Sequence, residues 1–377
     1  MSTLAEHTTA PTKNHLLELR ALGQSVWLDY IRRNLITSGE LKRLVDDGLG
    51  GLTSNPTIFD KAIAGSADYD EQLQQLLAVD PNMQPVALFD AIEIADIQAA
   101  ADVLRPVYDR TDGADGFVSI EVSPSLANDT AGSIAEARRL WNAVQRPNLL
   151  VKIPGTPEGI PAILTLIAES INVNITLMFS MAHYEAVANA YISGLERNFQ
   201  PQRVASVASF FVSRVDTAVD KALEKIGTPE ALALRGTIAV ANSKLVYQRF
   251  REIFSSDRWK TLAKRGARVQ RVLWASTGTK NPAYSDVLYV DSLIGADTVN
   301  TLPPETLKAF RDHGKVRETV TEGLDQARAA IERLGKLGVD LHAVTEQLQV
   351  DGVKAFADSM EKLLQSLEEK RAKIARR

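Results

Sequence analysis

The sequence has 377 residues, of which 45% are apolar and 24% charged, a composition typical of a globular protein in water. Its 43 basic and 47 acidic residues leave a net charge of −4, so no overall positive field favours nucleic acid or an anionic membrane. The lack of cysteine excludes disulfides, thiol nucleophiles and cysteine metal sites.

No segment has the apolar stretch of a secretory signal, and none approaches the roughly 18 consecutive apolar residues of a membrane span. We therefore expect a cytoplasmic enzyme without nucleic-acid or membrane partners. The sequence does not indicate the oligomeric state, and a monomer and a homodimer are both left open. The length suits one large domain or two medium ones, and we expect a single domain over 1–377. Within it, residues 1–13 are expected to be flexible, and residues 304–377 to add helices that pack on the main body.

In chain order, short apolar runs rich in β-branched residues alternate with stretches of helical periodicity. The runs predict strands over 25–30, 116–123, 149–153, 172–179, 204–212, 271–276 and 297–302. The segment 48–56, which is glycine-rich and then polar, is predicted to be a further strand that ends in a loop. Helical spacing predicts helices over 15–21, 38–45, 57–77, 86–108, 129–144, 157–168, 181–195 and 215–265, and again from 304 to the end. The helical pattern is weakest over 282–295, which we expect to be partly loop.

This alternation indicates parallel βαβ units, and eight of them suggest a single (β/α)8 barrel of the TIM type with extra N-terminal and C-terminal helices. A doubly wound open sheet is the competing topology. The placement of polar residues favours the barrel, because strand ends converge on one mouth only in a closed sheet. The residues at or just past predicted strand ends are Asp29, Asn55, Glu121, Lys152, Thr176, Ser209 and Ser276.

The run NLLVKIPG at 148–155 places Lys152 in a strand that is predicted to be buried on both faces. An ammonium there is expensive to bury unless it is paired, and a lysine that has given up its proton is a nucleophile toward carbonyls. The alternative is a structural lysine whose stem is buried and whose charge reaches solvent at the strand end. Lys152 is therefore a candidate Schiff-base residue.

Three other strand residues favour the catalytic interpretation. Asp29 ends an apolar run, Glu121 lies inside FVSIEVS, and Thr176 lies inside NVNITLMF. Each also has a structural alternative: a helix cap for Asp29, a salt bridge in the barrel wall for Glu121, and a β-branched strand residue for Thr176. The five histidines form no HxH or HExxH spacing, so we predict no metal site.

The motifs LTSNPTIF, VSIEVSP, LLVKIPGTPEGI, NVNITLMFS, SFFVSRVD and ASTGTKNP, in this order, resemble the transaldolase family over roughly residues 20–360. The length and the ASTGTKNP motif are similar to the longer bacterial subfamily. The resemblance implies a class I aldolase-type mechanism on an (α/β)8 barrel, without cofactor or metal.

Matched motif by motif, the resemblance gives each candidate a role. Lys152 corresponds to the Schiff-base lysine, Asp29 to the acid/base carboxylate, Glu121 to the second carboxylate and Thr176 to a threonine that holds a catalytic water. The positions that correspond to substrate-binding residues, some of them at the phosphate, are Asn55, Asn174, Ser209, Arg214 and Ser276.

One position departs from the family pattern. Many relatives have an arginine two residues after the serine of strand 7, whereas this chain has Gly278 after Ser276. Either Lys280 supplies the positive charge, or backbone N–H groups of the loop bind the phosphate. A lysine does not reproduce the planar, bidentate contact of an arginine, so donor and acceptor affinities are expected to differ.

The implied activity is that of a transferase in the non-oxidative pentose phosphate pathway. It moves a dihydroxyacetone unit from sedoheptulose 7-phosphate to glyceraldehyde 3-phosphate, giving erythrose 4-phosphate and fructose 6-phosphate. The alternatives are an aldolase that releases free dihydroxyacetone from fructose 6-phosphate, and a barrel that has lost catalysis and serves as a binding or assembly protein.

Overall fold

Eight parallel strands form a closed barrel, in the order β1 to β8, in the computed structural model, which describes residues 14–374. The strands are β1 Gln24–Asp29, β2 Gly51–Thr53, β3 Phe117–Glu121, β4 Leu149–Pro154, β5 Val173–Met178, β6 Ser206–Phe211, β7 Arg271–Ala275 and β8 Thr298–Leu302. Because β8 pairs in parallel with β1, the predicted (β/α)8 barrel is confirmed and the open doubly wound sheet is excluded. The predicted flexible segment 1–13 lies outside the described residues.

Two glycines before and within β2 are required by the packing inside the barrel. A Cβ on Gly51 would lie 2.6 Å from ring atoms of Trp27, and one on Gly50 would overlap Ser25 and Asp115. Trp27 donates from Nε1 to Asp115 Oδ1 at 2.9 Å, so the lower part of the barrel interior is filled by this indole and its carboxylate partner. The glycine-rich run before SNPT therefore has a packing role.

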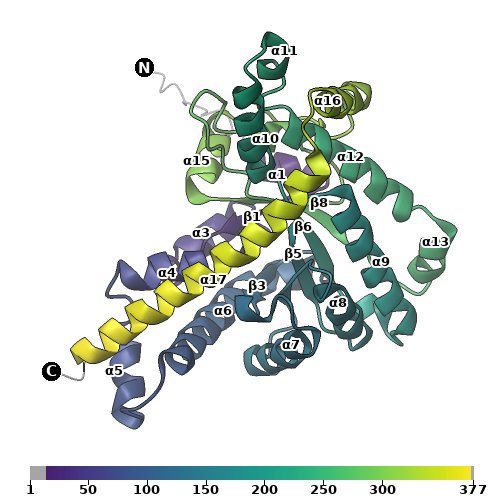
Figure 1. The fold of residues 1–377 in the computed structure, drawn as a ribbon. Helices are drawn as coiled ribbons and strands as arrows, with labels where there is room; N and C mark the ends of the chain where they lie inside the picture. The colour runs from purple at the N-terminus through teal and green to yellow at the C-terminus, as the bar shows by residue number, and fades with distance from the viewer. Residues whose placement is uncertain (1–13, 375–377) are drawn as a thin grey trace, which may run out of the picture.

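Helices surround the barrel and cover its strands (Figure 1). The helices of the first half are α1 His15–Ala21, α2 Arg33–Thr37, α3 Glu40–Asp46, α4 Pro56–Ala64, α5 Asp70–Val79, α6 Pro85–Arg110, α7 Thr130–Val144 and α8 Gly159–Ala168. Those of the second half are α9 Met181–Arg197, α10 Ser213–Ile226, α11 Pro229–Leu232, α12 Ile238–Ile253, α13 Asp257–Ala263, α14 Leu288–Ser292, α15 Pro304–His313, α16 Leu324–Lys336 and α17 Leu341–Ile374. No helix within residues 14–374 is long and apolar enough to cross a membrane.

Two predicted helices are broken in the structure. The segment 57–77 divides into α4 and α5, because Gly65 ends α4 and the Ser66 hydroxyl donates to Ala62 O at 2.8 Å. The segment 215–265 divides into α10 to α13: Gly227 adopts φ 73° at the end of α10, and Pro229 begins α11. Residues 33–37, which the periodicity did not predict, form the short helix α2. Over 282–295 the expectation of a partial loop is confirmed, since only α14 is helical there.

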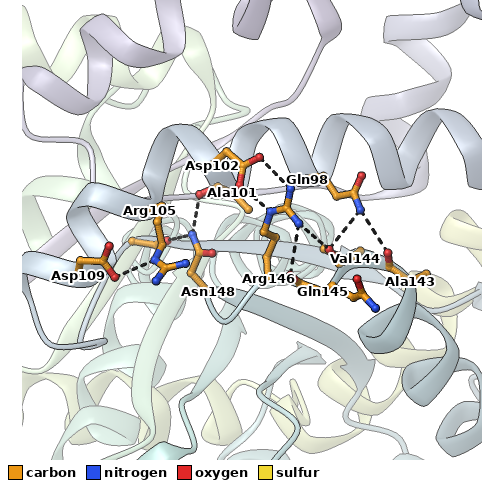
Figure 2. A network of polar contacts seen from close by, with 11 residues as sticks. Gln98, Ala101, Asp102, Arg105, Asp109, Ala143, Val144, Gln145, Arg146 and Asn148 are labelled. Atoms are coloured by element: carbon orange, nitrogen blue, oxygen red, sulfur yellow. Dashed lines mark hydrogen bonds and ion pairs between the residues drawn. The ribbon is translucent and has the colours of Figure 1, made fainter.

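A polar network fixes the approach to β4, the strand that carries Lys152. Figure 2 shows Arg146 paired with Asp102 of α6, with Nε 2.6 Å from Oδ1, and Gln98 donating to backbone carbonyls at the end of α7. Buried Asn148, just before β4, donates from Nδ2 to Ala101 O at 2.9 Å and to Gly116 O at 2.8 Å. These bonds join the start of β4 to α6 and to the turn before β3.

The last helix, α17, crosses the barrel beside the carboxyl ends of the strands (Figure 1). It packs along α4, and it also contacts α6, α10 and β5. Gln349 of this helix donates from Nε2 to Gly155 O and to Leu177 O, each at 3.0 Å. The helix is thus bonded to the backbone at the ends of β4 and β5, next to the mouth of the barrel.

Candidate active site

A pocket of about 460 Å³ opens at the carboxyl ends of the strands. It contains all the predicted site residues except Glu121: Asp29, Asn55, Lys152, Asn174, Thr176, Ser209, Arg214, Ser276 and Lys280. A larger surface hollow of about 1000 Å³ lies beside α1, α3 and α15 and contains none of these residues. The residues predicted from the sequence to form the site therefore lie together in the barrel mouth, where TIM barrels have their active sites.

Lys152 lies at the floor of the pocket and is paired. Its Nζ donates to Glu121 Oε2 and to the backbone carbonyl of Ser54, both at 2.9 Å. The strand register explains the pairing, since Lys152 is the direct neighbour of Glu121 on β3 and of Asn174 on β5. The lysine and glutamate side chains are only 7% and 5% exposed. Glu121 therefore lies behind the lysine rather than on the pocket surface.

Burial raises the pKa of the Glu121 carboxyl, and the adjacent lysine opposes this shift. A carboxylate with a raised pKa accepts a proton more readily. The pair can therefore exist as ammonium and carboxylate or, after one proton crosses the 2.9 Å contact, as amine and carboxylic acid. The second form supplies a nucleophilic amine.

Asp29 ends β1 on the side of the pocket formed by β1 and β2. Its Oδ1 accepts a hydrogen bond of 2.8 Å from Thr53, its register partner on β2. Burial raises the pKa of Asp29, while Lys152, the Thr53 hydrogen bond, Lys280 and Arg214 act in the opposite direction. A buried carboxyl whose pKa is raised accepts a proton more readily than an exposed one.

Polar side chains of β5 and β6 form the opposite wall. Asn174 donates to Ser119 Oγ at 3.0 Å and accepts from Ser209 Oγ at 2.7 Å, which fixes the orientation of its amide. Thr176 lines the pocket two residues further along β5, and its buried Oγ1 has no hydrogen-bond partner among residues 14–374. That hydroxyl can bind substrate or a water molecule.

Asn55 lies between β2 and α4. Its Oδ1 caps the helix by accepting from Ile58 N at 3.0 Å, and the residue also lines the pocket. Because the oxygen is used by the cap, the Nδ2 amide is the group available to a ligand.

Arg214 and Lys280 bring positive charge to the outer part of the pocket. Arg214, in the first turn of α10, lies over the Phe211 ring, 5.3 Å from its centroid. Burial lowers the pKa of Arg214, whereas Asp29 and Glu121 raise it. Ser276, with φ 55°, places its Oγ 3.0 Å from Ser213 Oγ.

The lysine of the ASTGTKNP motif folds back toward the glycine that replaces the expected arginine. Its Nζ lies 4.0 Å from the position that a Cβ on Gly278 would occupy. The side chain of Lys280 thus brings its charge to the place where an arginine at 278 would begin. That Lys280, rather than backbone N–H groups of the loop, supplies the phosphate-binding charge stays a prediction.

Comparison with known proteins decides the family. The family model described as Transaldolase/Fructose-6-phosphate aldolase matches residues 26–367. The chain belongs to this family. It is 46% identical to "Transaldolase" of Trichodesmium erythraeum, over 96% of this chain and 98% of the relative. It is 49% identical to "Transaldolase" of Thiobacillus denitrificans over 92% and 98%, and 50% identical to that of Parafrankia sp. over 94% and 97%.

Several residues of this transaldolase-family pocket were missed by sequence reasoning. The period-2 pattern of β2 could have identified Thr53, because it predicts that Thr53 points to the same face as Asn55. The Ser54 carbonyl that accepts from Lys152 carries no side-chain signal. Phe356 of α17 lies far from the other residues in sequence, and nothing in the helical pattern marks it. Other lining residues not predicted are Tyr30, Thr57, Ile58, Lys61, Phe211, Leu273, Ala275, Thr301, Pro303, Pro304 and Glu305.

Within residues 14–374, no group of three or more His, Asp or Glu side chains is arranged to hold a metal ion. The chemistry that the described side chains can perform is proton exchange by Asp29 and Glu121 and nucleophilic attack by Lys152. This is the chemistry of carbonyl condensation and carbon–carbon bond cleavage through an imine.

Proposed function

We propose that the protein is a transaldolase, which transfers a dihydroxyacetone unit from sedoheptulose 7-phosphate to glyceraldehyde 3-phosphate and gives erythrose 4-phosphate and fructose 6-phosphate. The relatives named transaldolase support the reaction. The observation that carries the mechanism is the buried contact of 2.9 Å between Lys152 Nζ and Glu121 Oε2 on the pocket floor. Lys152 is the Schiff-base residue of the proposal.

In the first step, Glu121 takes a proton from Lys152, and the amine attacks the C2 carbonyl of the ketose. The carbinolamine loses water when an acid returns a proton to its oxygen, and Glu121 is that acid, directly or through a water held by Thr176. The product is an iminium ion on Lys152. Its positive nitrogen attracts the electrons of the bond that breaks next.

In the second step, the Asp29 carboxylate removes the proton of the C4 hydroxyl. The C3–C4 bond breaks, the aldose phosphate leaves, and the electron pair of that bond forms a three-carbon enamine on Lys152. The acceptor aldehyde then enters, the enamine carbon attacks its carbonyl, and Asp29 returns the proton to the new hydroxyl. Attack by water on the resulting iminium releases the product and restores the amine.

The remaining pocket residues bind the substrate. In the proposed enzyme, Asn174, Ser209 and Asn55 bind the hydroxyls of the dihydroxyacetone unit. Arg214, Lys280 and Ser276 bind the terminal phosphate, since a guanidinium, an ammonium and a hydroxyl are typical phosphate ligands. A cytoplasmic location and a monomeric or homodimeric state stay predictions.

The family model also covers fructose-6-phosphate aldolases, so product analysis is needed. The proposed enzyme releases the aldose phosphate but keeps the three-carbon unit until an acceptor arrives. Turnover of fructose 6-phosphate to free dihydroxyacetone without an acceptor, at a rate equal to transfer, would identify an aldolase instead.

Borohydride trapping tests the site. Reduction in the presence of fructose 6-phosphate should attach a permanent adduct to the peptide that contains Lys152, and Lys152→Ala should abolish both adduct and turnover. Two other lysines line the pocket, Lys61 and Lys280. Alanine at either should leave the adduct on Lys152, whereas an adduct mapped to Lys61 or Lys280 would disprove the assignment.

A further inference from the structure

The helix α17 contributes a residue to the pocket, although it follows the last strand by many residues. Among the described lining residues, Phe356 is the one that comes from this helix. Phe356 is 5% exposed, and its ring lies near two of the cationic groups of the site, those of Lys152 and Arg214. A buried aromatic ring thus lines a pocket whose other lining residues are mostly polar or charged.

The ring of Phe356 contacts both the proposed nucleophile and the proposed phosphate ligand. Its centroid is 5.9 Å from Lys152 Nζ and 5.8 Å from the guanidinium carbon of Arg214. The guanidinium carbon of Arg214 also lies 5.3 Å from the centroid of the Phe211 ring. These distances fall within the roughly 6 Å at which a cation is attracted to an aromatic face. Two phenylalanines from different parts of the chain therefore hold one guanidinium.

The position of the ring is set by contacts along α17. One turn before Phe356, Gly352 allows close approach, since a Cβ there would lie 2.8 Å from Leu177 and 3.5 Å from Arg214. Ser359 accepts a hydrogen bond of 2.8 Å from Thr57 of α4. The Gln349 bonds to the ends of β4 and β5 fix the helix on the other side. Figure 1 shows the resulting path of α17 across the barrel.

We propose that Phe356 is a specificity-determining residue with two effects on the reaction. Its ring positions Arg214 for the phosphate, and its apolar bulk keeps water from the enamine on Lys152. The second effect determines whether the dihydroxyacetone unit is transferred to an aldehyde or lost to solvent. This inference rests on the proposed transaldolase function and extends it.

The loss that Phe356 prevents is a balanced reaction. Water donates a proton to the enamine carbon, which gives an iminium ion and hydroxide. Hydroxide or water then adds to the iminium carbon, the C–N bond breaks, and free dihydroxyacetone leaves. The net change consumes one water and restores the lysine amine. The step needs no reactant besides water, so its rate depends on access of water to the enamine.

Two substitutions separate the effects. Phe356→Leu keeps apolar bulk and removes the ring, so the KM for fructose 6-phosphate should rise about fivefold. The release per transfer, meaning the free dihydroxyacetone formed per dihydroxyacetone unit transferred to the acceptor, should stay within about twofold of wild type. Phe356→Ala removes both, so release per transfer should rise about tenfold as well. Dihydroxyacetone is measured with a coupled reductase, and erythrose 4-phosphate is the acceptor.

The matched control is Leu363→Ala on the same helix. Leu363 is 0% exposed and does not line the pocket, so this variant loosens α17 without opening the mouth. It should leave release per transfer unchanged. An equal rise in Leu363→Ala and Phe356→Ala would overturn the proposal, because mobility of the helix alone would explain the loss.

Borohydride trapping of the wild type, run in parallel, separates this proposal from the proposed function. If wild-type Lys152 is not trapped, the proposed function fails. If it is trapped, and Phe356→Ala releases no more dihydroxyacetone than wild type, the proposed shielding is wrong although the transaldolase function stands. An unchanged KM in Phe356→Leu likewise refutes the positioning of Arg214.

A second variant keeps the test of shielding decisive if Phe356→Ala does not fold. Phe356→Val then takes its place in the same measurement, because valine is a smaller apolar side chain than leucine. Its release per transfer should exceed that of Phe356→Leu, and a release equal to that of Phe356→Leu would refute the shielding.

Discussion

Glu121→Gln is the sharpest test of how Lys152 is activated. Glutamine keeps the size of the side chain and one oxygen acceptor, but it cannot take a proton from the lysine. The affected atoms are 2.9 Å apart, and both side chains are nearly excluded from solvent. The variant thus removes proton exchange and leaves the geometry almost intact.

The expected loss of rate follows from the value of general acid–base catalysis, about 10²- to 10⁴-fold. Borohydride trapping of the fructose 6-phosphate imine at pH 7 should slow by that amount. The free energy of unfolding should fall by less than the loss of an ion-pair partner normally costs. Removing one partner of a buried ion pair costs about 3–5 kcal/mol, but here the glutamine oxygen still accepts a hydrogen bond from the ammonium. We therefore expect about 1–3 kcal/mol, the penalty for weakening a buried hydrogen bond.

Glu93→Gln is the matched control. Glu93 of α6 is also buried, at 4% exposed, but neither lines the pocket nor forms a salt bridge with Lys152. The rate of borohydride trapping in Glu93→Gln should stay within about threefold of wild type, since Glu93 takes no part in the proton exchange with Lys152. If Glu121→Gln traps as fast as Glu93→Gln, the carboxylate does not activate the lysine, and the reasoning is refuted.

Three further results are expected. Asp29→Asn should still form the imine but lose cleavage by about 10²- to 10⁴-fold; because burial raises the pKa of Asp29 above its ordinary 3.8, wild-type cleavage should fall as the pH drops through that raised value. A normal rate of cleavage in the variant would exclude Asp29 as the base. Arg214→Ala and Lys280→Ala should mainly raise the KM for phosphorylated sugars, and an equal effect on unphosphorylated dihydroxyacetone donors would contradict a phosphate role. Burial also raises the pKa of Glu93 well above its ordinary 4.5. The folded protein then keeps a proton that the unfolded chain loses above pH 4.5, so folding stability declines as the pH rises past 4.5; Glu93→Gln removes this decline and should raise the Tm at about pH 7 but not at about pH 4. A lower Tm than wild type at neutral pH would contradict this sign.

Most strands were predictable because they are short apolar runs with clear boundaries. The exception is β2, where only Gly51–Thr53 of the glycine-rich and then polar segment 48–56 forms a strand. The predicted strand over 149–153 became Leu149–Pro154, and that over 204–212 became Ser206–Phe211. Helix breaks were harder, because apolar spacing can continue in phase across a break. Gly65 follows α4, and Gly227 ends α10 in the left-handed conformation, but the apolar spacing alone marks neither break.

The catalytic candidates were predictable for a different reason. A barrel brings strand ends together, so Asp29, Glu121 and Lys152 could be placed in one mouth before their contacts were known. Contacts made by the backbone or by a distant helix carry no such signal. The Ser54 carbonyl that accepts from Lys152 and the Phe356 ring near Arg214 emerge only from the three-dimensional arrangement.

Gly278, which stands where many relatives have an arginine, packs closely against the residues that begin α15, and the nearby positive charge comes from Lys280. A Cβ at this position would lie 3.3 Å from Pro303 and 3.3 Å from Thr306, so a larger residue would press on the start of α15. The same loop carries Lys280, whose Nζ comes within 4.0 Å of that Cβ position. Packing against α15 thus favours glycine at 278, and the positive charge is supplied two residues later. A lysine makes a point contact rather than a bidentate one, and Arg214 is the only planar cation among the described lining residues. In the proposed function, its contact with Phe356 therefore bears directly on substrate affinity.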